Sequence, residues 1–175
     1  WDVVVIKSGI IRGDYMQQFV PWYTIYAECL RRYTLPLWTR YIQCGFPIFA
    51  EGQIGALYPF NILFFAFLPF KIAYNYSFLA HFILGGVFMY IYARKIGTDA
   101  WGAFLAAILL CFGSMYAGAF INISTLKSLC FFPLILFIYE KYLEPQRKKA
   151  GHFFLIGTIW GIQLLTGSYQ MTAYS

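Results

Sequence analysis

Residues 76–93 read YSFLAHFILGGVFMYIYA, and this stretch decides how the rest of the chain is interpreted. It contains no Asp, Glu, Lys or Arg, and Arg94 and Lys95 follow it directly. A helix needs about 20 mostly apolar residues to cross a bilayer, with a range of roughly 17–25. The sequence therefore predicts a transmembrane helix over residues 76–93.

Three further apolar segments of similar length follow, at residues 101–120, 126–142 and 153–174. Tyr and Trp lie near the ends of these segments, as in the aromatic belts of membrane proteins. The chain is 61% hydrophobic and only 11% charged, whereas soluble domains carry about 25% charged residues. We predict an all-α membrane protein, in which residues 76–175 form a polytopic bundle of four transmembrane helices.

The basic residues predict the orientation of the bundle. Arg94 and Lys95 follow the first span, and residues 147–149 (RKK) follow the third. Lys and Arg gather in cytoplasmic loops, so residues 1–75 are expected to form an extracytoplasmic loop of a multi-pass protein in the cell (inner or plasma) membrane. The net charge of +6 does not indicate nucleic acid, because no basic stripe with interleaved aromatics is present.

Two short helices are predicted within this first loop. Pro59 and Pro69 interrupt the apolar stretch 54–70, which leaves residues 60–68 as a short helix at the membrane interface. A second interpretation, in which residues 54–70 span the membrane and everything before them changes sides, stays open. Residues 21–33 have helical apolar spacing at Trp22, Ile25, Tyr26, Cys29, Leu30 and Tyr33. This helix lies on the membrane surface or packs on the bundle, and the pattern does not separate the two.

The chain begins with Trp1 rather than Met and stops at Ser175. We expect it to be an N-terminal fragment that lacks a first span and the downstream part of a longer protein. Cys29 and Cys44 both fall in the expected outer loop, where a disulfide is chemically allowed, but their spacing does not establish one.

Asp14 is the leading candidate for chemistry. It lies in the loop before the predicted helix 21–33, close to the membrane boundary. A carboxylate there can act as a general base or bind a divalent metal such as Mg or Mn, although a turn role is the commoner use of Gly-Asp. Glu51 is a candidate second carboxylate, with a solvated loop residue as the alternative. Arg12 and Arg40 are candidate partners for phosphate.

Polar residues inside the apolar segments have two possible roles. His81, Gln163 and Gln170 either serve function or, more commonly, bond neighbouring helices. Lys127 begins the third span, where we expect it to snorkel to the headgroups or contact a lipid phosphate.

Four motifs resemble those of the YfhO-like bacterial membrane proteins. The sequence GDYMQQFVPW at 13–22 resembles the start of that family's first outer loop, and LPLW at 35–38 followed by GFP at 45–47 resembles its next conserved stretch. YPFN at 58–61 and QLLTGSYQ at 163–170 resemble two later motifs. The resemblance covers residues 13–175, almost the whole chain.

This family is similar to type-C glycosyltransferases, and the resemblance implies a function. Such enzymes transfer a sugar from a polyprenyl-phosphate carrier outside the cytoplasm, here to a cell-envelope glycopolymer or lipid acceptor. It implies that Asp14 is the base or metal contact. The motif positions also make Gln17, Gln18, Tyr58 and Gln170 candidates for substrate binding, beside Arg12 and Arg40.

The chain departs from the family pattern at two places. Thr39-Arg40 replaces Asn-Pro, and Ser168-Tyr169 replaces His-Pro, so no role of that His is carried over. A non-catalytic carrier or assembly partner for envelope polymers is the alternative function. A transporter ranks below both, because it would need paired ionisable residues near the midplane.

Overall fold

The computed structural model describes residues 18–119, 122–143 and 149–175. This part of the chain is all-helical, and its only extended pairing is an isolated antiparallel bridge between Thr39 and Phe46. The elements are α2 (Phe19–Arg31), α3 (Ile48–Glu51), α4 (Pro59–Phe67), α5 (Phe70–Lys95), α6 (Ala100–Phe112), α7 (Ser114–Ala119), α8 (Ile123–Leu129), α9 (Phe132–Leu143), α10 (Lys149–Leu164) and α11 (Tyr169–Tyr174).

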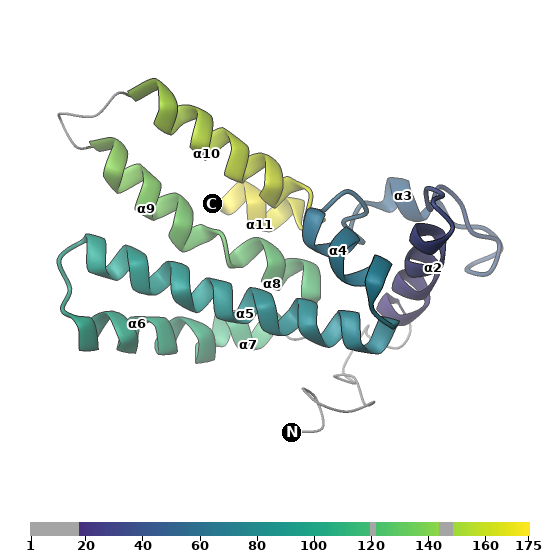
Figure 1. Cartoon of the computed structure of the whole chain (residues 1–175), viewed down its shortest axis with the longest axis horizontal. Coiled ribbons are helices and arrows are strands. Elements are labelled where there is room, and N and C mark those ends of the chain that lie inside the picture. The colour runs from purple at the N-terminus through teal and green to yellow at the C-terminus, as the bar shows by residue number, and fades with distance from the viewer. Residues whose placement is uncertain (1–17, 120–121, 144–148) are drawn as a thin grey trace.

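Helix α5 is the axis of the molecule, and it contacts α2, α4, α6, α8 and α9 (Figure 1). Its 26 residues correspond to about 39 Å at 1.5 Å per residue, more than the roughly 30 Å of a hydrocarbon core. The segment Ile123–Leu143, which comprises α8 and α9, is also long and apolar enough to cross a membrane. Within the described ranges, these two segments alone have the length and composition of a span.

The other predicted spans are interrupted. Gly113 has extended backbone angles and divides the segment 101–120 between α6, which has 13 residues and begins at Ala100, and the short helix α7. The segment 153–174 breaks after Leu164, where a turn at Gly167 precedes α11. The candidate span Ile123–Leu143 is also irregular where α8 meets α9, because Pro133 in the first turn of α9 lacks an N–H and its ring crowds the preceding turn.

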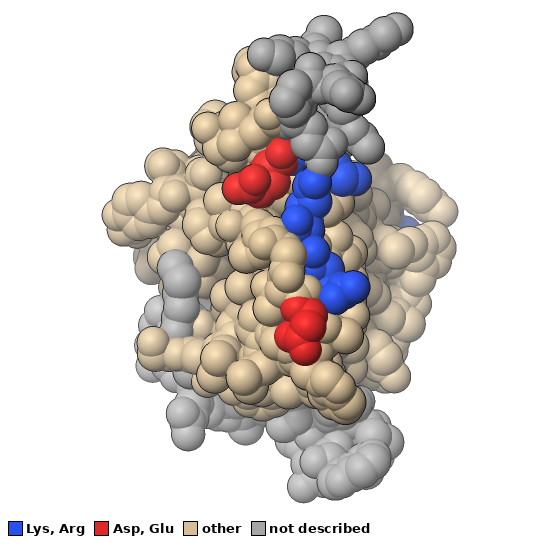
Figure 2. Space-filling view, turned by 90° about the vertical axis from the view of Figure 1, so that its left-hand side faces the viewer, with Lys and Arg blue, Asp and Glu red and all other residues tan. Residues whose placement is uncertain are grey.

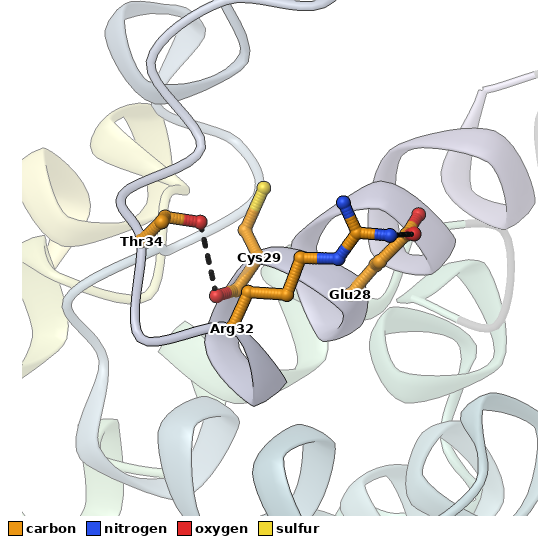
Figure 3. Close-up of polar contacts among 4 residues, drawn as sticks. All are labelled: Glu28, Cys29, Arg32 and Thr34. Carbon is orange, nitrogen blue, oxygen red and sulfur yellow. Dashed lines mark hydrogen bonds and ion pairs between the residues drawn. The ribbon is translucent and has the colours of Figure 1, made fainter.

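The short helices α2, α3 and α4 gather at one end of α5 (Figure 1). Helix α4 has nine residues, or about 14 Å, which is too short to cross a bilayer. Helix α2 packs on α4 and α5, as the second of its two predicted placements requires. Figure 3 shows the exposed end of α2, where Arg32 pairs with Glu28 over 2.5 Å and Thr34 caps the carbonyl of Cys29 over 3.2 Å.

The buried face of α2 differs from the predicted one. It consists of Phe19, Trp22, Tyr23, Tyr26 and Ala27, and Tyr33 lies beyond the helix with 98% of its surface exposed. Tyr23 stacks on Phe65 of α4 with ring centroids 4.6 Å apart. Aromatic packing of this kind adds about 0.5–1.5 kcal/mol to the burial of apolar area, and it turns the tyrosines of α2 inward.

Charge and apolar surface are separated along the molecule. Between Lys71 and Arg94, helix α5 carries no charged residue. Large apolar side chains lie exposed on α5, α6 and α10, in what we call the apolar belt. Among them are Ile83, Val87, Phe104, Leu109, Phe112, Phe154 and Trp160. Contiguous exposed apolar surface of this kind marks a membrane or protein contact.

The end of the molecule opposite α2 is charged. Arg94 and Lys95 end α5, Lys141 lies in the last turn of α9, and Asp99 caps α6 by accepting a hydrogen bond from the Gly102 N–H over 3.0 Å. Figure 2 shows basic side chains between acidic ones on this face. The described charges therefore lie mainly at two poles, with an apolar belt between them.

Candidate functional site

A polar pocket opens at the α2–α4 pole. It has a volume of about 430 Å³ and is lined by Gln18, Trp22, Ile42, Gln43, Phe46, Glu51 and Gln53. These residues come from α2 and the position just before it, from α3, and from the loops on both sides of α3. A concave site with a few convergent polar groups is where ligand binding is expected first.

Two aromatic rings form one wall of the polar pocket. Trp22 and Phe46 stack with centroids 5.2 Å apart and an interplanar angle of 18°. Phe46 is held by the bridge to Thr39, in which the two main chains exchange hydrogen bonds of 2.9 and 2.8 Å. Trp22 belongs to the buried face of α2, so this wall joins the loop to the helix.

The loop that carries Phe46 contains two residues with backbone strain. Gln43 and Cys44 have φ angles of +49° and +61°, in the left-handed region that residues other than Gly rarely adopt. Each such residue costs of order 1 kcal/mol, and strain of this kind gathers at ligand sites. The turn brings Gln43 to the pocket lining.

A carboxylate and two amides form the polar wall. The Gln53 N–H donates to Glu51 Oε2 over 2.8 Å, and Gln18 Nε2 donates to Gln53 Oε1 over 3.2 Å. Partial burial raises the pKa of the Glu51 carboxyl, and the hydrogen bond from the Gln53 backbone opposes this shift. Carboxyls with raised pKa values in a cleft are candidates for acid–base roles.

Two glycines fix the loop after α3, which we call the pocket loop (residues 52–56), to the bundle. Gly167 has φ +89°, and a Cβ there would lie 2.5 Å from the carbonyl oxygen of Gly52. Gly55 has φ +61°, and its Cβ would lie 2.8 Å from the carbonyl oxygen of Leu165. The pocket loop and the turn between α10 and α11 therefore pack backbone against backbone, which is possible only without side chains.

Hydrogen bonds hold the same loop from three helices. Asn61 of α4 donates to the carbonyls of Ile54 and Gly55 over 2.7 and 2.9 Å. Tyr26 of α2 donates to the carbonyl of Ala56 over 2.9 Å, and Ser124 of α8 donates to that of Gln53 over 2.5 Å. The segment 53–56 is thus held by side chains from three helices although it is not helical, and its first residue, Gln53, lines the polar pocket.

A buried lysine cluster, consisting of Lys127, Tyr23 and Asn61, lies where α2, α4 and α8 meet. All three side chains have 0% exposure. Lys127 Nζ donates to Asn61 Oδ1 over 2.6 Å and to the Tyr23 hydroxyl over 3.1 Å, and it lies 5.0 Å from the centroid of the Tyr23 ring. The predicted snorkelling of Lys127 toward headgroups is wrong, because the side chain points into the bundle.

His81 also lies in the interior. Its Nδ1 is 2.6 Å from the carbonyl oxygen of Ser77, which can only accept, so Nδ1 carries the proton. Its Nε2 is 2.6 Å from the Tyr58 hydroxyl. Gln163 donates to the carbonyl of Ser128 over 3.0 Å. His81 and Gln163 thus make the hydrogen bonds between elements that are the common role of polar groups in apolar helices.

The structure brings two of the predicted site residues together. Gln18 and Glu51 both line the polar pocket. Arg40 is exposed on the loop that leads to the pocket, and Gln170 is exposed and donates to the Tyr174 hydroxyl over 3.0 Å. Tyr58 is buried, and its hydroxyl is engaged by His81. Arg12, Asp14 and Gln17 lie outside the described residues.

The sequence did not predict Gln43, Gln53 and Phe46 as residues of this pocket. Gln53 follows Glu51 by two residues, which is the only local signal for it. Gln43 and Phe46 reach the pocket through the left-handed turn, which no residue pattern predicts. The described residues contain no group of three or more His, Cys, Asp or Glu side chains that would hold a metal ion.

Comparisons with known proteins give no identification. No protein-family model, no curated protein and no solved structure matches this chain.

Proposed function

We propose that this chain is part of a membrane glycosyltransferase that transfers a sugar from a polyprenyl-phosphate carrier to a cell-envelope acceptor. The observation that carries the proposal is the polar pocket, which places a carboxylate, three glutamine amides and an aromatic wall at one pole of an apolar helical molecule. Carboxylates and amides supply the acceptors and donors that sugar hydroxyl groups need.

The position of the pocket suits a lipid-borne donor. The prenyl chain of such a donor stays in the hydrocarbon, while its phosphate and sugar lie at the membrane surface. Two segments long enough to span a membrane and the exposed apolar belt support insertion in a bilayer. In the proposed orientation, the basic pole at Arg94 and Lys95 is cytoplasmic, and the pole with the polar pocket faces outward.

Glu51 is the described residue best suited to general-base catalysis. Its raised pKa makes the ionised carboxylate a stronger base. It could take the proton of an acceptor hydroxyl as that oxygen attacks the anomeric carbon of the sugar, while the bond from this carbon to the phosphate breaks and the polyprenyl phosphate leaves. Asp14, which the family resemblance assigns as base or metal contact, is the second candidate for this role. Gln18 and Gln53 would orient the sugar.

The test is sugar transfer by the full-length protein in membranes supplied with labelled polyprenyl-phosphate sugars. We expect Glu51→Gln and Asp14→Asn each to lower transfer by about 10²-fold or more, the usual contribution of a positioned base. Glu28→Gln is the matched control, because Glu28 lies on the exposed face of α2 and outside the pocket.

Each outcome separates the alternatives. Transfer that falls in one site variant, at equal protein level and with the control unchanged, assigns that carboxylate. Equal transfer in all variants removes both carboxylates from the mechanism. Absence of transfer with a broad panel of donors overturns the enzyme proposal in favour of a carrier or assembly partner.

A further inference from the structure

A groove runs between α5 and α6, away from the polar pocket. The two helices lie side by side (Figure 1), and the groove between them has a volume of about 340 Å³. This volume is within the range of small-molecule sites. The side chains that line it are apolar or aromatic, and several of them, including Ile83, Val87 and Phe104, are exposed on the surface of the apolar belt.

Small residues form the base of the α5–α6 groove. A Cβ on Gly86 would lie 3.0 Å from Cys111 Sγ, and the Cys111 thiol lies 3.6 Å from the carbonyl oxygen of Phe82. The helices therefore approach closely along this line, where Ala107 also lies. Larger side chains stand on both sides of the line, so the surface between them is hollowed.

The groove has the length of one leaflet of a bilayer. At its inner end, the rings of Phe82 and Phe112 meet edge to face with centroids 5.6 Å apart. Phe82 is at the middle of α5, and the segment from Phe82 to Arg94 corresponds to about 18 Å at 1.5 Å per residue. One leaflet supplies half of a hydrocarbon core of roughly 30 Å, so the groove extends from the centre of the span to the basic pole.

The outer end of the groove carries an indole and a cation. A second hollow of about 250 Å³ shares Tyr90 and Phe104 with the groove and continues it to Trp101. Trp101 is exposed, as tryptophans at a membrane interface are. Arg94, one turn after Tyr90, is exposed and donates to the carbonyl of Thr98 over 3.0 Å. A guanidinium has five N–H donors, so one bond to the turn leaves others for a ligand.

We propose that the α5–α6 groove binds one acyl chain of an anionic phospholipid, whose headgroup phosphate contacts Arg94. Arginine matches the geometry of phosphate oxygens, and basic sites between membrane helices bind anionic headgroups. The acidic residue beside this end, Asp99, is engaged by the Gly102 N–H over 3.0 Å. An acyl chain is thin enough to enter the hollow, whereas a helix about 10 Å across would lie on its rims.

This lipid site is independent of the proposed sugar transfer. It requires only that α5 crosses a bilayer, and it lies toward the pole opposite the polar pocket. Its occupant is a lipid of the leaflet on the basic side, held by its acyl chain and its charge together. The anionic headgroup is what distinguishes this lipid from the neutral lipids around the apolar belt.

The first test compares two lipids on the purified full-length protein in detergent. Phosphatidylglycerol and phosphatidylcholine with identical acyl chains are titrated separately, and the bound lipid is counted by native mass spectrometry. We expect phosphatidylglycerol to bind at least about fivefold more tightly, which is the effect of one basic side chain on an anionic lipid. Equal affinities for the two lipids, or no bound lipid, would overturn the proposal.

A change of charge tests the outer end. We expect Arg94→Gln to weaken the binding of phosphatidylglycerol about fivefold and to leave phosphatidylcholine unaffected. Lys71→Gln is the matched control, because Lys71 is exposed in the first turn of α5, at the other pole. Equal losses in both variants would show a general attraction to charge and would reject the site at Arg94.

A change of shape tests the groove itself. Ala107→Phe fills the base, and we expect it to weaken the binding of both lipids, whereas Leu105→Phe, on exposed surface of α6 outside the groove, should not. If Ala107→Phe does not accumulate, Val87→Phe narrows the groove from its exposed wall. Binding that neither of these two changes reduces would reject the groove as the site.

Cross-linking gives the location directly. Phosphatidylglycerol with a photoreactive diazirine near the end of its acyl chain is incorporated with the full-length protein into vesicles and irradiated. We expect the modified residues to lie in 82–90 and 104–112. Modification confined to other segments would overturn the proposal, since it would mean that another helix or a second copy of the chain covers the groove.

Discussion

The side-chain oxygen of Asn61 lies 2.6 Å from Lys127 Nζ, while the amide nitrogen of Asn61 donates to the carbonyls of Ile54 and Gly55. One buried amide thus connects the lysine of α8 to the loop that carries Gln53. A change at Asn61 should therefore affect the cation and the loop together.

Replacement of Asn61 tests this coupling. We expect Asn61→Leu to lower the free energy of unfolding by about 3 kcal/mol or more, because it leaves a buried ammonium with one partner fewer and two carbonyls without donors. Equilibrium unfolding in detergent measures the change. Ile62→Ala, at the neighbouring position with 40% exposure, should cost less than about 1 kcal/mol; similar losses in both variants would contradict the role given to Asn61.

Gly167 and Gly161 both lie in the segment 153–174, and replacing them with alanine should change the stability of the protein in opposite directions. At Gly167 the positive φ and the carbonyl of Gly52 leave no room for a Cβ, so Gly167→Ala should destabilise the protein by about 1–3 kcal/mol. Gly161 lies within α10 with nothing within 4 Å of an added Cβ, and Gly161→Ala should stabilise by about 0.5–1 kcal/mol. Thermal unfolding of both variants decides the matter, and the same sign in both would refute the close backbone packing.

Glu51 predicts a dependence of stability on pH. Burial raises the pKa of this carboxyl in the folded protein, so between its ordinary value and the raised one the folded state binds more protons than the unfolded state. Stability therefore falls as the pH rises through this window. Glu51→Gln removes the titration and should raise the Tm relative to the wild type at pH 7 but not at pH 4.

The control for this pH effect is Glu28→Gln on the exposed face of α2. The difference in Tm between Glu51→Gln and the wild type should change between the two pH values, whereas the difference for Glu28→Gln should change much less. A difference for Glu51→Gln that stays constant with pH would mean that burial of the carboxylate has no energetic consequence.

A native cysteine reports the orientation in the membrane. Cys44 is an exposed free thiol at the pole with the polar pocket, whereas Cys29 at the same pole is half-buried and Cys111 and Cys130 are buried. If this pole is extracytoplasmic, a membrane-impermeant maleimide should label the protein in intact cells, and Cys44→Ser should abolish most of the labelling.

The opposite pole supplies the complementary measurement. A cysteine introduced by Leu143→Cys, at the exposed end of α9, in the Cys44→Ser background should react only after the cells are permeabilised. The reverse pattern would place the basic pole outside and invert the proposed orientation.

Part of the candidate site was predictable. Gln18 and Glu51 were predicted as site residues, and both line the polar pocket. Their partners Gln43 and Phe46 were not predicted, because a left-handed turn and an isolated bridge bring them there. Such contacts depend on backbone geometry between residues that share no periodicity, so a residue pattern does not reveal them.

What the sequence by itself determined is the helical character of the chain and the position of α5. The uncharged stretch between Lys71 and Arg94 is long enough for a span, and the prolines at 59 and 69 limit α4 to a short helix. These features are local, since hydrophobic length and a missing N–H act within one segment.

Only the tertiary structure decided which way the polar side chains point. Lys127 at the start of an apolar helix was expected to reach toward the membrane surface, but the oxygens of Asn61 and Tyr23 draw it into the bundle. Those partners lie 66 and 104 residues away in sequence. A long flexible side chain takes the direction in which its charge is best solvated, and that direction exists only once α2, α4 and α8 are assembled.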